Sequence, residues 1–109
     1  MSQQTETVAF RMNLNPGHAA EYKRRHDDIW PELSSALIEA GVIDYQIFLD
    51  PLSGHLFAIL TRRTDHTMGD LPRTEIMQRW WAMMADIMQA GADNVPVQVD
   101  LAPVFHLRR

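Results

Sequence analysis

The chain has 109 residues, of which 46% are hydrophobic and 22% are charged, a composition typical of one folded domain spanning residues 1–109. The formal net charge of −4 argues against a nucleic-acid-binding protein, and the absence of cysteine excludes disulfides and thiolate chemistry. The longest apolar run, residues 80–85, is too short to span a bilayer, and residues 1–6 lack the pattern of a signal peptide. We therefore expect a cytoplasmic protein without a membrane or nucleic-acid partner.

The first part of the chain predicts a strand followed by a broken helix. Residues 7–13 alternate, with Val8, Phe10 and Met12 on one side, which indicates a strand. Asn15 is a good N-cap and Pro16 suits the first helical position, so the helix is expected to begin there and to stop at Gly41. Because a proline disfavours helical geometry in the residue before it, we expect a break at Trp30, with Pro31 restarting the helix.

A hairpin is predicted next. Residues 42–50 form an expected strand that carries Ile43, Tyr45, Ile47 and Leu49 on one face. The turn chemistry of residues 50–54 then leads into a third strand over residues 55–61. This third strand is apolar on both faces, which suggests that neither face meets water.

The last third of the sequence is less regular. Residues 62–74 are polar and contain glycine and proline, and they predict no clear element. A helix is expected over residues 74–90, with Thr74 as a possible cap and Gly91 as its stop. Residues 95–107 should be extended, with interruptions at Pro96 and Pro103.

The element order strand, helix, strand, strand, helix, strand is that of a ferredoxin-like α+β sandwich, written βαββαβ. Such a sheet carries both helices on one face and leaves the other face bare. We expect a second copy to cover that face, at Phe48 and at either Phe57 or Ile59, giving a homodimer with a dimeric α/β-barrel assembly.

Tyr22 and His26 are the first candidates for chemistry. They lie one helical turn apart and share a face, so a phenol and an imidazole enter the same space. A histidine can move a proton near neutral pH, which makes His26 a candidate acid/base. The alternative is a helix histidine that only bonds a neighbouring carboxylate, Asp27 or Asp28.

Aromatic residues elsewhere extend this candidate site. Tyr45 belongs to the apolar face of the second strand, where a buried hydroxyl needs a partner. Trp80 and Trp81 point about 100° apart on the last helix, each in a stripe with methionines. Composition alone favours a core role for both stripes, whereas indole rings also suit the apolar faces of a sugar.

The stretch from Tyr22 to Leu33, the segment 78–81 (Gln-Arg-Trp-Trp) and the loop around Asp93 and Asn94 resemble the L-rhamnose mutarotase family. Members of that family are small cofactor-free enzymes, and the resemblance implies interconversion of the α and β pyranose anomers of L-rhamnose by acid/base ring opening and closure. It also implies that His26 is the proton donor and that the substrate is contacted by Tyr22, Tyr45, Trp80 and Trp81.

Two departures from the family pattern concern the expected pocket rim. The family usually carries a tryptophan near the position of Met68, within a segment that Pro72 also alters, and a tyrosine is common where this chain has His106. Both differences bear on substrate preference rather than on reaction type.

Other functions remain open from the residues themselves. The same fold order also hosts cofactor-free monooxygenases and small-ligand binding modules, since fold does not decide function. No metal is expected, because His18 and His26 lie about 12 Å apart along a helix, too far to share one ion.

Overall fold

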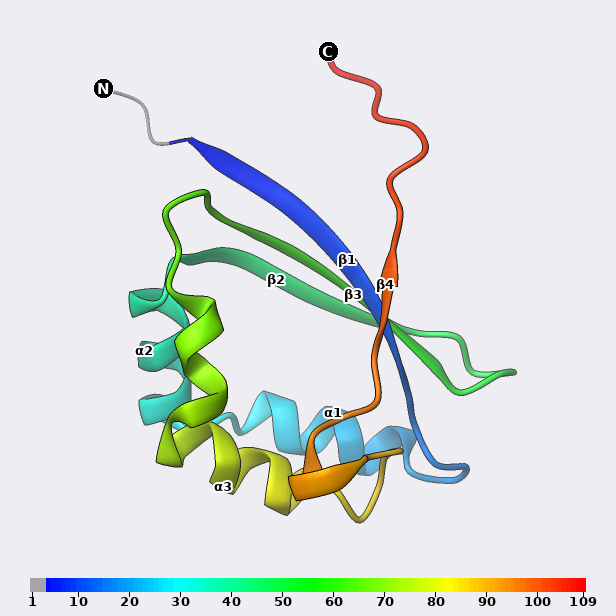
Figure 1. The fold of residues 1–109 in the computed structure, drawn as a ribbon. Coiled ribbons are helices and arrows are strands. Elements are labelled where there is room, and N and C mark those ends of the chain that lie inside the picture. Colours follow the sequence, from blue (N-terminus) through cyan, green and yellow to red (C-terminus); the bar gives the residue numbers. More distant parts are fainter. Residues whose placement is uncertain (1–3) are drawn as a thin grey trace.

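The computed structural model describes residues 4–109, which form one antiparallel sheet with helices on one of its faces (Figure 1). The sheet has the strand order β2-β3-β1-β4. The elements in chain order are β1 (Thr5–Asn13), α1 (Ala19–Asp27), α2 (Pro31–Glu39), β2 (Val42–Leu49), β3 (His55–Arg63), the 3₁₀ helix η1 (Met68–Arg73), α3 (Glu75–Met84), η2 (Ala92–Asn94) and β4 (Val99–Leu101). This arrangement confirms the ferredoxin-like α+β fold.

The predicted break in the first helical region is confirmed. Trp30 has an extended backbone and Pro31 occupies the first position of α2, so α1 and α2 are separate helices that run in different directions (Figure 1). Gly41 ends α2 with a φ of +115°, a conformation that glycine adopts readily. A β-carbon at Gly41 would lie 2.9 Å from Cβ of His66, so the close approach to that loop also requires glycine.

The predicted start of α1 at Pro16 is wrong. The helix begins at Ala19, with His18 as the N-cap residue. Gly17 has a φ of +83°, which interrupts any helical path through Pro16. The backbone nitrogen of Asn15 donates instead to the carbonyl of Ile87 over 2.9 Å, so this segment prolongs the pairing of β1 and does not cap a helix.

One residue of β2 does not face the expected side. Val42 pairs with Arg62 and Asp44 pairs with Thr61, so Ile43 is the extra residue of a β-bulge. Its side chain is 52% exposed and stands apart from the face that carries Tyr45. The expected grouping of Ile43 with Tyr45 is therefore wrong, because the bulge shifts the alternation by one residue.

The helix α3 begins as predicted but ends early. Its N-cap Thr74 accepts a hydrogen bond from the Met77 amide through Oγ1 over 3.4 Å. The helix stops at Met84, not at residue 90, because the chain then pairs with the end of β1. The Gln89 amide donates to the Asn13 carbonyl over 2.9 Å, and this backbone bond competes with helical geometry.

The C-terminal region contains less strand than expected. Of residues 95–107 only the three residues of β4 belong to the sheet, where Phe10 pairs with Asp100. Residues 102–109 leave the sheet without regular structure and extend away from the helices (Figure 1). They include exposed apolar side chains, among them Val104 and Phe105.

The core lies between the helices and the face of the sheet that they cover. Among the least exposed side chains are Leu33 from α2, Leu56 and Leu60 from β3, and Met84 and Ile87 around the end of α3. The covered face of the sheet therefore contributes to the core, and it also forms one wall of the cavity between sheet and helices. Within residues 4–109, no helix is long and apolar enough to cross a membrane.

Candidate active site

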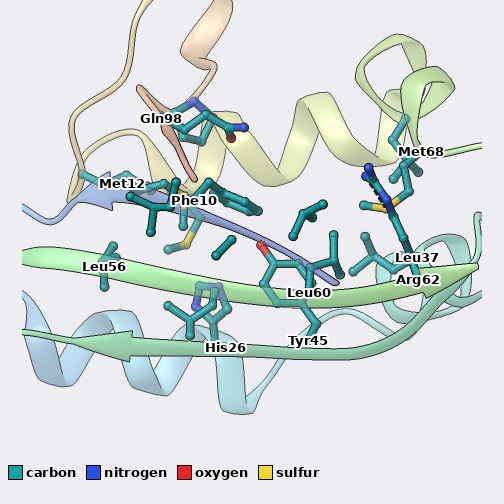
Figure 2. A pocket seen from close by; sticks show the side chains of 18 of the residues that line it. Phe10, Met12, His26, Leu37, Tyr45, Leu56, Leu60, Arg62, Met68 and Gln98 are labelled. Carbon is teal, nitrogen blue, oxygen red and sulfur yellow. Dashed lines mark hydrogen bonds between the residues drawn. The ribbon is translucent and has the colours of Figure 1, made fainter. Parts of the chain in front are cut away.

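A cavity of about 1750 Å³ lies between the inner face of the sheet and the helices (Figure 2). The five residues expected at the site all line it: Tyr22, His26, Tyr45, Trp80 and Trp81. They come from α1, β2 and α3, so three separate elements converge on one space. The volume exceeds the 300–1,000 Å³ that is usual for small-molecule pockets, so a monosaccharide would occupy only a part of it.

The imidazole of His26 is oriented by its own helix. Its Nδ1 lies 3.0 Å from the Tyr22 carbonyl oxygen, and because a carbonyl only accepts, Nδ1 must carry the hydrogen. The neutral ring then has its lone pair on Nε2, for which no hydrogen-bond partner is found within residues 4–109. Burial lowers the pKa of His26, against the smaller opposing effects of the Tyr22 carbonyl and Asp27, so the neutral form dominates at neutral pH.

The plain alternative for His26, a bond to a neighbouring carboxylate, does not match the structure. Asp27 pairs with Lys23 over 2.7 Å, and Asp28 lies 3.7 Å from the guanidinium of Arg24. Neither carboxylate therefore bonds the imidazole, although Asp27 also lines the cavity. His26 instead contacts aromatic rings on the cavity side.

Those rings hold the imidazole from two directions. The Tyr22 ring stacks at a centroid distance of 4.3 Å with a tilt of 30°. The Trp80 ring meets the imidazole edge to face at 5.3 Å, and Trp30 meets Trp80 in the same manner at 5.2 Å. The imidazole of His26 is thus held between the rings of Tyr22 and Trp80, and Trp80 is itself held by Trp30. These contacts fix the position of Nε2.

The two tyrosines place phenol groups in the cavity. Burial raises the pKa of Tyr22 far above its ordinary range and raises that of Tyr45 to about 12, so both hydroxyls are neutral donors at physiological pH. Tyr45 packs edge to face on Phe10 with centroids 6.4 Å apart. Neither hydroxyl has a hydrogen-bond partner within residues 4–109, so a ligand hydroxyl can supply one.

Trp80 and Trp81 differ in burial. Trp80 is only 7% exposed and belongs to the core cluster, so for this residue the core interpretation and the cavity interpretation both hold. Trp81 is half-buried and also lines a smaller cavity of about 590 Å³ beside the η2 loop. In that loop Asp93 and Asn94 have φ values of +57° and +62°, which these two residue types tolerate better than most.

Several cavity residues were not identified from the sequence. The alternation of β1 groups Phe10 with Val8 and Met12 but does not say which face of the sheet they occupy, and the structure shows that Phe10 lines the cavity and packs on Tyr45. Asp100 pairs with Phe10 and therefore lies on the same face of the sheet. The sequence predicts only an extended segment over residues 95–107, so it does not indicate that Asp100 faces the cavity. Arg62 and Gln98 also line the cavity, and Figure 2 shows both side chains.

Both departures from the family pattern lie at the cavity. Met68 and His106 line it, and the sulfur of Met68 lies 3.8 Å from Nη1 of Arg62 (Figure 2). Both positions at which the sequence is expected to depart from the family pattern thus belong to the cavity lining, and Met68 lies beside Arg62. Within the described part of the chain, no three or more histidine, aspartate or glutamate side chains form a group that could hold a metal ion.

Comparisons with known proteins identify the family of the chain. Residues 7–107 match the sequence model of the L-rhamnose mutarotase family. An L-rhamnose mutarotase from Paraburkholderia phytofirmans is 63% identical over 102 residues, which cover 94% of this chain and 95% of that protein. The crystal structure of an L-rhamnose mutarotase from Formosa agariphila superposes with a TM-score of 0.87 at 44% identity, covering 94% of this chain and 99% of that one.

A more distant match concerns the fold alone. A putative antibiotic biosynthesis monooxygenase from Nitrosomonas europaea superposes with a TM-score of 0.61 at 10% identity, covering 96% of this chain and 95% of that one. Proteins of different function thus share the sandwich, and the sequence match decides between them. Matched over nearly its whole length, the chain belongs to the L-rhamnose mutarotase family.

Proposed function

We propose that this chain acts as a single mutarotase domain that interconverts the α and β pyranose anomers of L-rhamnose without a cofactor. The observation that carries the proposal is the orientation of His26, whose Nδ1 bonds the Tyr22 carbonyl over 3.0 Å and leaves Nε2 as the free nitrogen. The imidazole stands in a cavity walled by neutral phenols and indoles. Such a site offers one proton carrier and several surfaces for a deoxysugar.

The proton transfers balance with His26 alone as the carrier. Nε2 takes the proton of the anomeric hydroxyl, the C1–O5 bond breaks, and C1 becomes an aldehyde carbon. The imidazolium then gives the proton to the ring oxygen O5. After rotation about the C1–C2 bond the steps run in reverse, O5 attacks the other face of C1, and the second anomer forms. A lowered pKa of His26 suits this sequence, because the cycle starts from the neutral ring.

The remaining cavity residues are proposed to bind the sugar. The hydroxyls of Tyr22 and Tyr45 donate to or accept from sugar hydroxyls, since neither hydroxyl has a partner among residues 4–109. The indole rings of Trp80 and Trp81 offer flat apolar surface to the methyl group and the C–H faces of the sugar. Binding and proton transfer are thus assigned to different side chains.

The function is tested by measuring magnetization exchange between the anomeric protons of L-rhamnose. With catalytic amounts of the protein, we expect exchange well above the rate in the same buffer without it. Rates equal to those in buffer alone would refute the mutarotase proposal. Sugar binding with no gain in exchange would identify a binding module instead.

We also propose that the chain forms a homodimer through the outer face of the sheet, the face opposite the helices. The strand register places Phe48 opposite Phe57, and Arg11 opposite both Phe57 and Val99, so these side chains share that face. Phe48 is 54% exposed and Ile59 is 41% exposed. Nε of Arg11 is buried without a partner among the described residues, so an acceptor from a second copy would satisfy it.

The dimer predicts a clear effect of a charge at Phe48. Sedimentation at micromolar concentration should show a dimer for the wild type and a monomer for Phe48→Asp, because the carboxylate would be buried at the interface without a partner. Leu52→Asp is the matched control, since Leu52 is 97% exposed but lies in the hairpin turn. A clean wild-type monomer, or equal dissociation of both variants, contradicts this interface.

A further inference from the structure

The helix α1 carries both Tyr22 and His26, yet it has little to hold it in place. It has nine residues, and isolated helices shorter than about 12–15 residues are marginal in water. Tyr22 is its one buried side chain. Gly17 precedes the helix with a φ of +83° and the break at Trp30 follows it, so the neighbouring segments do not extend it. The position of the site residues therefore depends on specific contacts between α1 and the rest of the fold.

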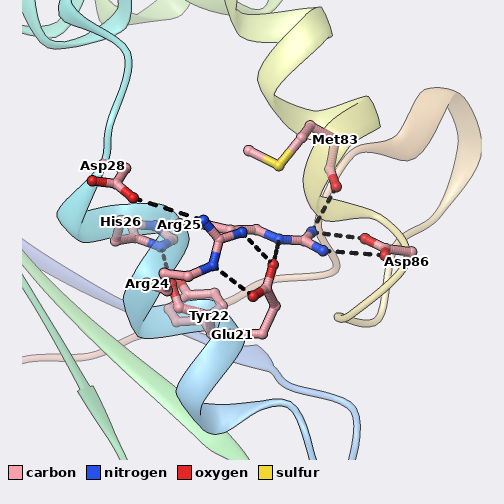
Figure 3. A network of polar contacts seen from close by, with 8 residues as sticks. All are labelled: Glu21, Tyr22, Arg24, Arg25, His26, Asp28, Met83 and Asp86. Carbon is pink, nitrogen blue, oxygen red and sulfur yellow. Dashed lines mark hydrogen bonds and ion pairs between the residues drawn. The ribbon is translucent and has the colours of Figure 1, made fainter.

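The guanidinium of Arg25 makes the polar part of those contacts (Figure 3). Within α1, its Nε donates to Glu21 over 2.6 Å. Across to the end of α3, its Nη1 donates to the Met83 carbonyl and to Asp86, both over 2.8 Å, and Nη2 reaches the second oxygen of Asp86 at 3.3 Å. Arg25 is 14% exposed, so this planar fork of donors is largely withdrawn from water.

The Met83 carbonyl belongs to the last turn of α3, where carbonyls have no amide of the helix to accept from. A cation at this position is also stabilised by the negative end of the helix dipole. Arg25 thus caps α3 while it joins α1 to it. The residue that follows Arg25 in the chain is His26, and its contact on α3, Trp80, lies one turn before Met83. The helices α1 and α3 are therefore joined by two adjacent contacts, the polar contact of Arg25 and the aromatic contact between His26 and Trp80.

Arg24 shows what is particular to Arg25. Arg24 also bonds Glu21, over 2.7 Å, and it lies 3.7 Å from Asp28. All of these partners belong to α1 or its immediate end, and Arg24 is 62% exposed. The two arginines are neighbours with the same charge and one shared partner, but only Arg25 reaches another helix.

We propose that Arg25 is a positioning residue, which holds α1 against the end of α3 so that His26 keeps its place over the cavity. The proposal rests on the function assigned to His26 above. Arg25 itself does not line the cavity, so it acts through the helix and not on the sugar. Its two carboxylate partners remain charged near neutral pH, since Arg24 and Arg25 lower the pKa of Glu21 to about 2 and Arg25 lowers that of Asp86.

The test compares Arg25→Met with Arg24→Met, which removes the same charge from the next position. At saturating L-rhamnose, well below the melting temperature, we expect Arg25→Met to lower kcat by about ten- to a hundredfold, because small displacements of a catalytic group cost rates of this order. KM should change less, since Tyr45, Trp80 and Trp81 bind from other elements. Arg24→Met should stay within about twofold of the wild type, as exposed ion pairs contribute little.

Amide hydrogen exchange provides a second measurement, which does not require the sugar. In Arg25→Met the amides of α1 should lose protection while those of β1 and β3 keep it, because one helix opens locally. Unchanged kcat and unchanged α1 protection, or equal losses in both variants, would overturn the positioning role. If the wild type exchanges no anomers, the proposed function fails, but the hydrogen-exchange comparison still decides whether Arg25 fastens α1.

Discussion

The variant His26→Ala is expected to fold and assemble like the wild type and to exchange L-rhamnose anomers about 10²–10⁴-fold more slowly. The replacement removes the proton carrier and leaves the tyrosines and tryptophans of the cavity in place. Sugar binding should therefore persist while ring opening fails. Magnetization exchange at saturating sugar measures the rate, and titration of the tryptophan fluorescence measures the binding.

A second histidine of the same helix region provides the control. His18 is the N-cap residue of α1 and does not line the cavity, so His18→Ala should retain most of the exchange activity. If His26→Ala matches the wild-type rate at saturating sugar, His26 is structural and the proton steps proposed for it are wrong.

The pH dependence of the wild type reports on the same group. Burial lowers the pKa of His26 below its ordinary 6.5, so the neutral base persists as the pH falls past that value. Exchange should therefore stay level through pH 6.5 and decline only below it. The contribution of His26 to the free energy of unfolding changes with pH in the same direction as the exchange activity. Below pH 6.5 the unfolded chain binds a proton that the folded chain does not, so the free energy of unfolding falls with falling pH.

The variant Trp80→Ala is expected to lose about 3–5 kcal/mol of unfolding free energy and most of its activity. Trp80 is 7% exposed, and its ring contacts both His26 and Trp30, so removing it leaves a cavity beneath the catalytic imidazole. Urea unfolding measures the loss of stability. Exchange measured under conditions in which the variant is folded separates the catalytic effect from the unfolding.

Trp81→Ala is the comparison for this variant. Trp81 is half-buried on the next position of α3, so its removal should weaken sugar binding while costing less stability. Equal losses of unfolding free energy in the two variants would contradict the assignment of Trp80 to the core. The pair thus distinguishes a residue with two roles from a residue that mainly contacts the ligand.

Features that depend on neighbouring residues were predictable from the sequence. The break at Pro31 follows from the steric effect of proline on Trp30, and the cap at Thr74 follows from a hydroxyl before an apolar run. The strand order follows from the sequence of elements, and the convergence of Tyr22 with His26 follows from their helical spacing. Tyr45, Trp80 and Trp81 come from other elements, and their place at the site was predicted from the resemblance to the family and not from local spacing.

Features that depend on distant pairing were not predictable. The helix α3 stops at Met84 because Gln89 bonds Asn13, 76 residues away, and no local pattern near Gln89 signals this. The bulge at Ile43 arises from the register of β2 against β3. Asp100 reaches the cavity only through its pairing with Phe10. Each of these outcomes results from competition between a local preference and a backbone bond formed elsewhere in the chain.

The two faces of the sheet serve different purposes, and this division has a consequence for cooperativity. The sugar cavity lies on the helix side, whereas the proposed dimer contact lies on the opposite side, around Phe48 and Arg11. In such a dimer two whole sheets separate the cavities, and neither subunit contributes a cavity wall to the other through this contact. Each subunit should then bind sugar independently, with a Hill coefficient of about 1.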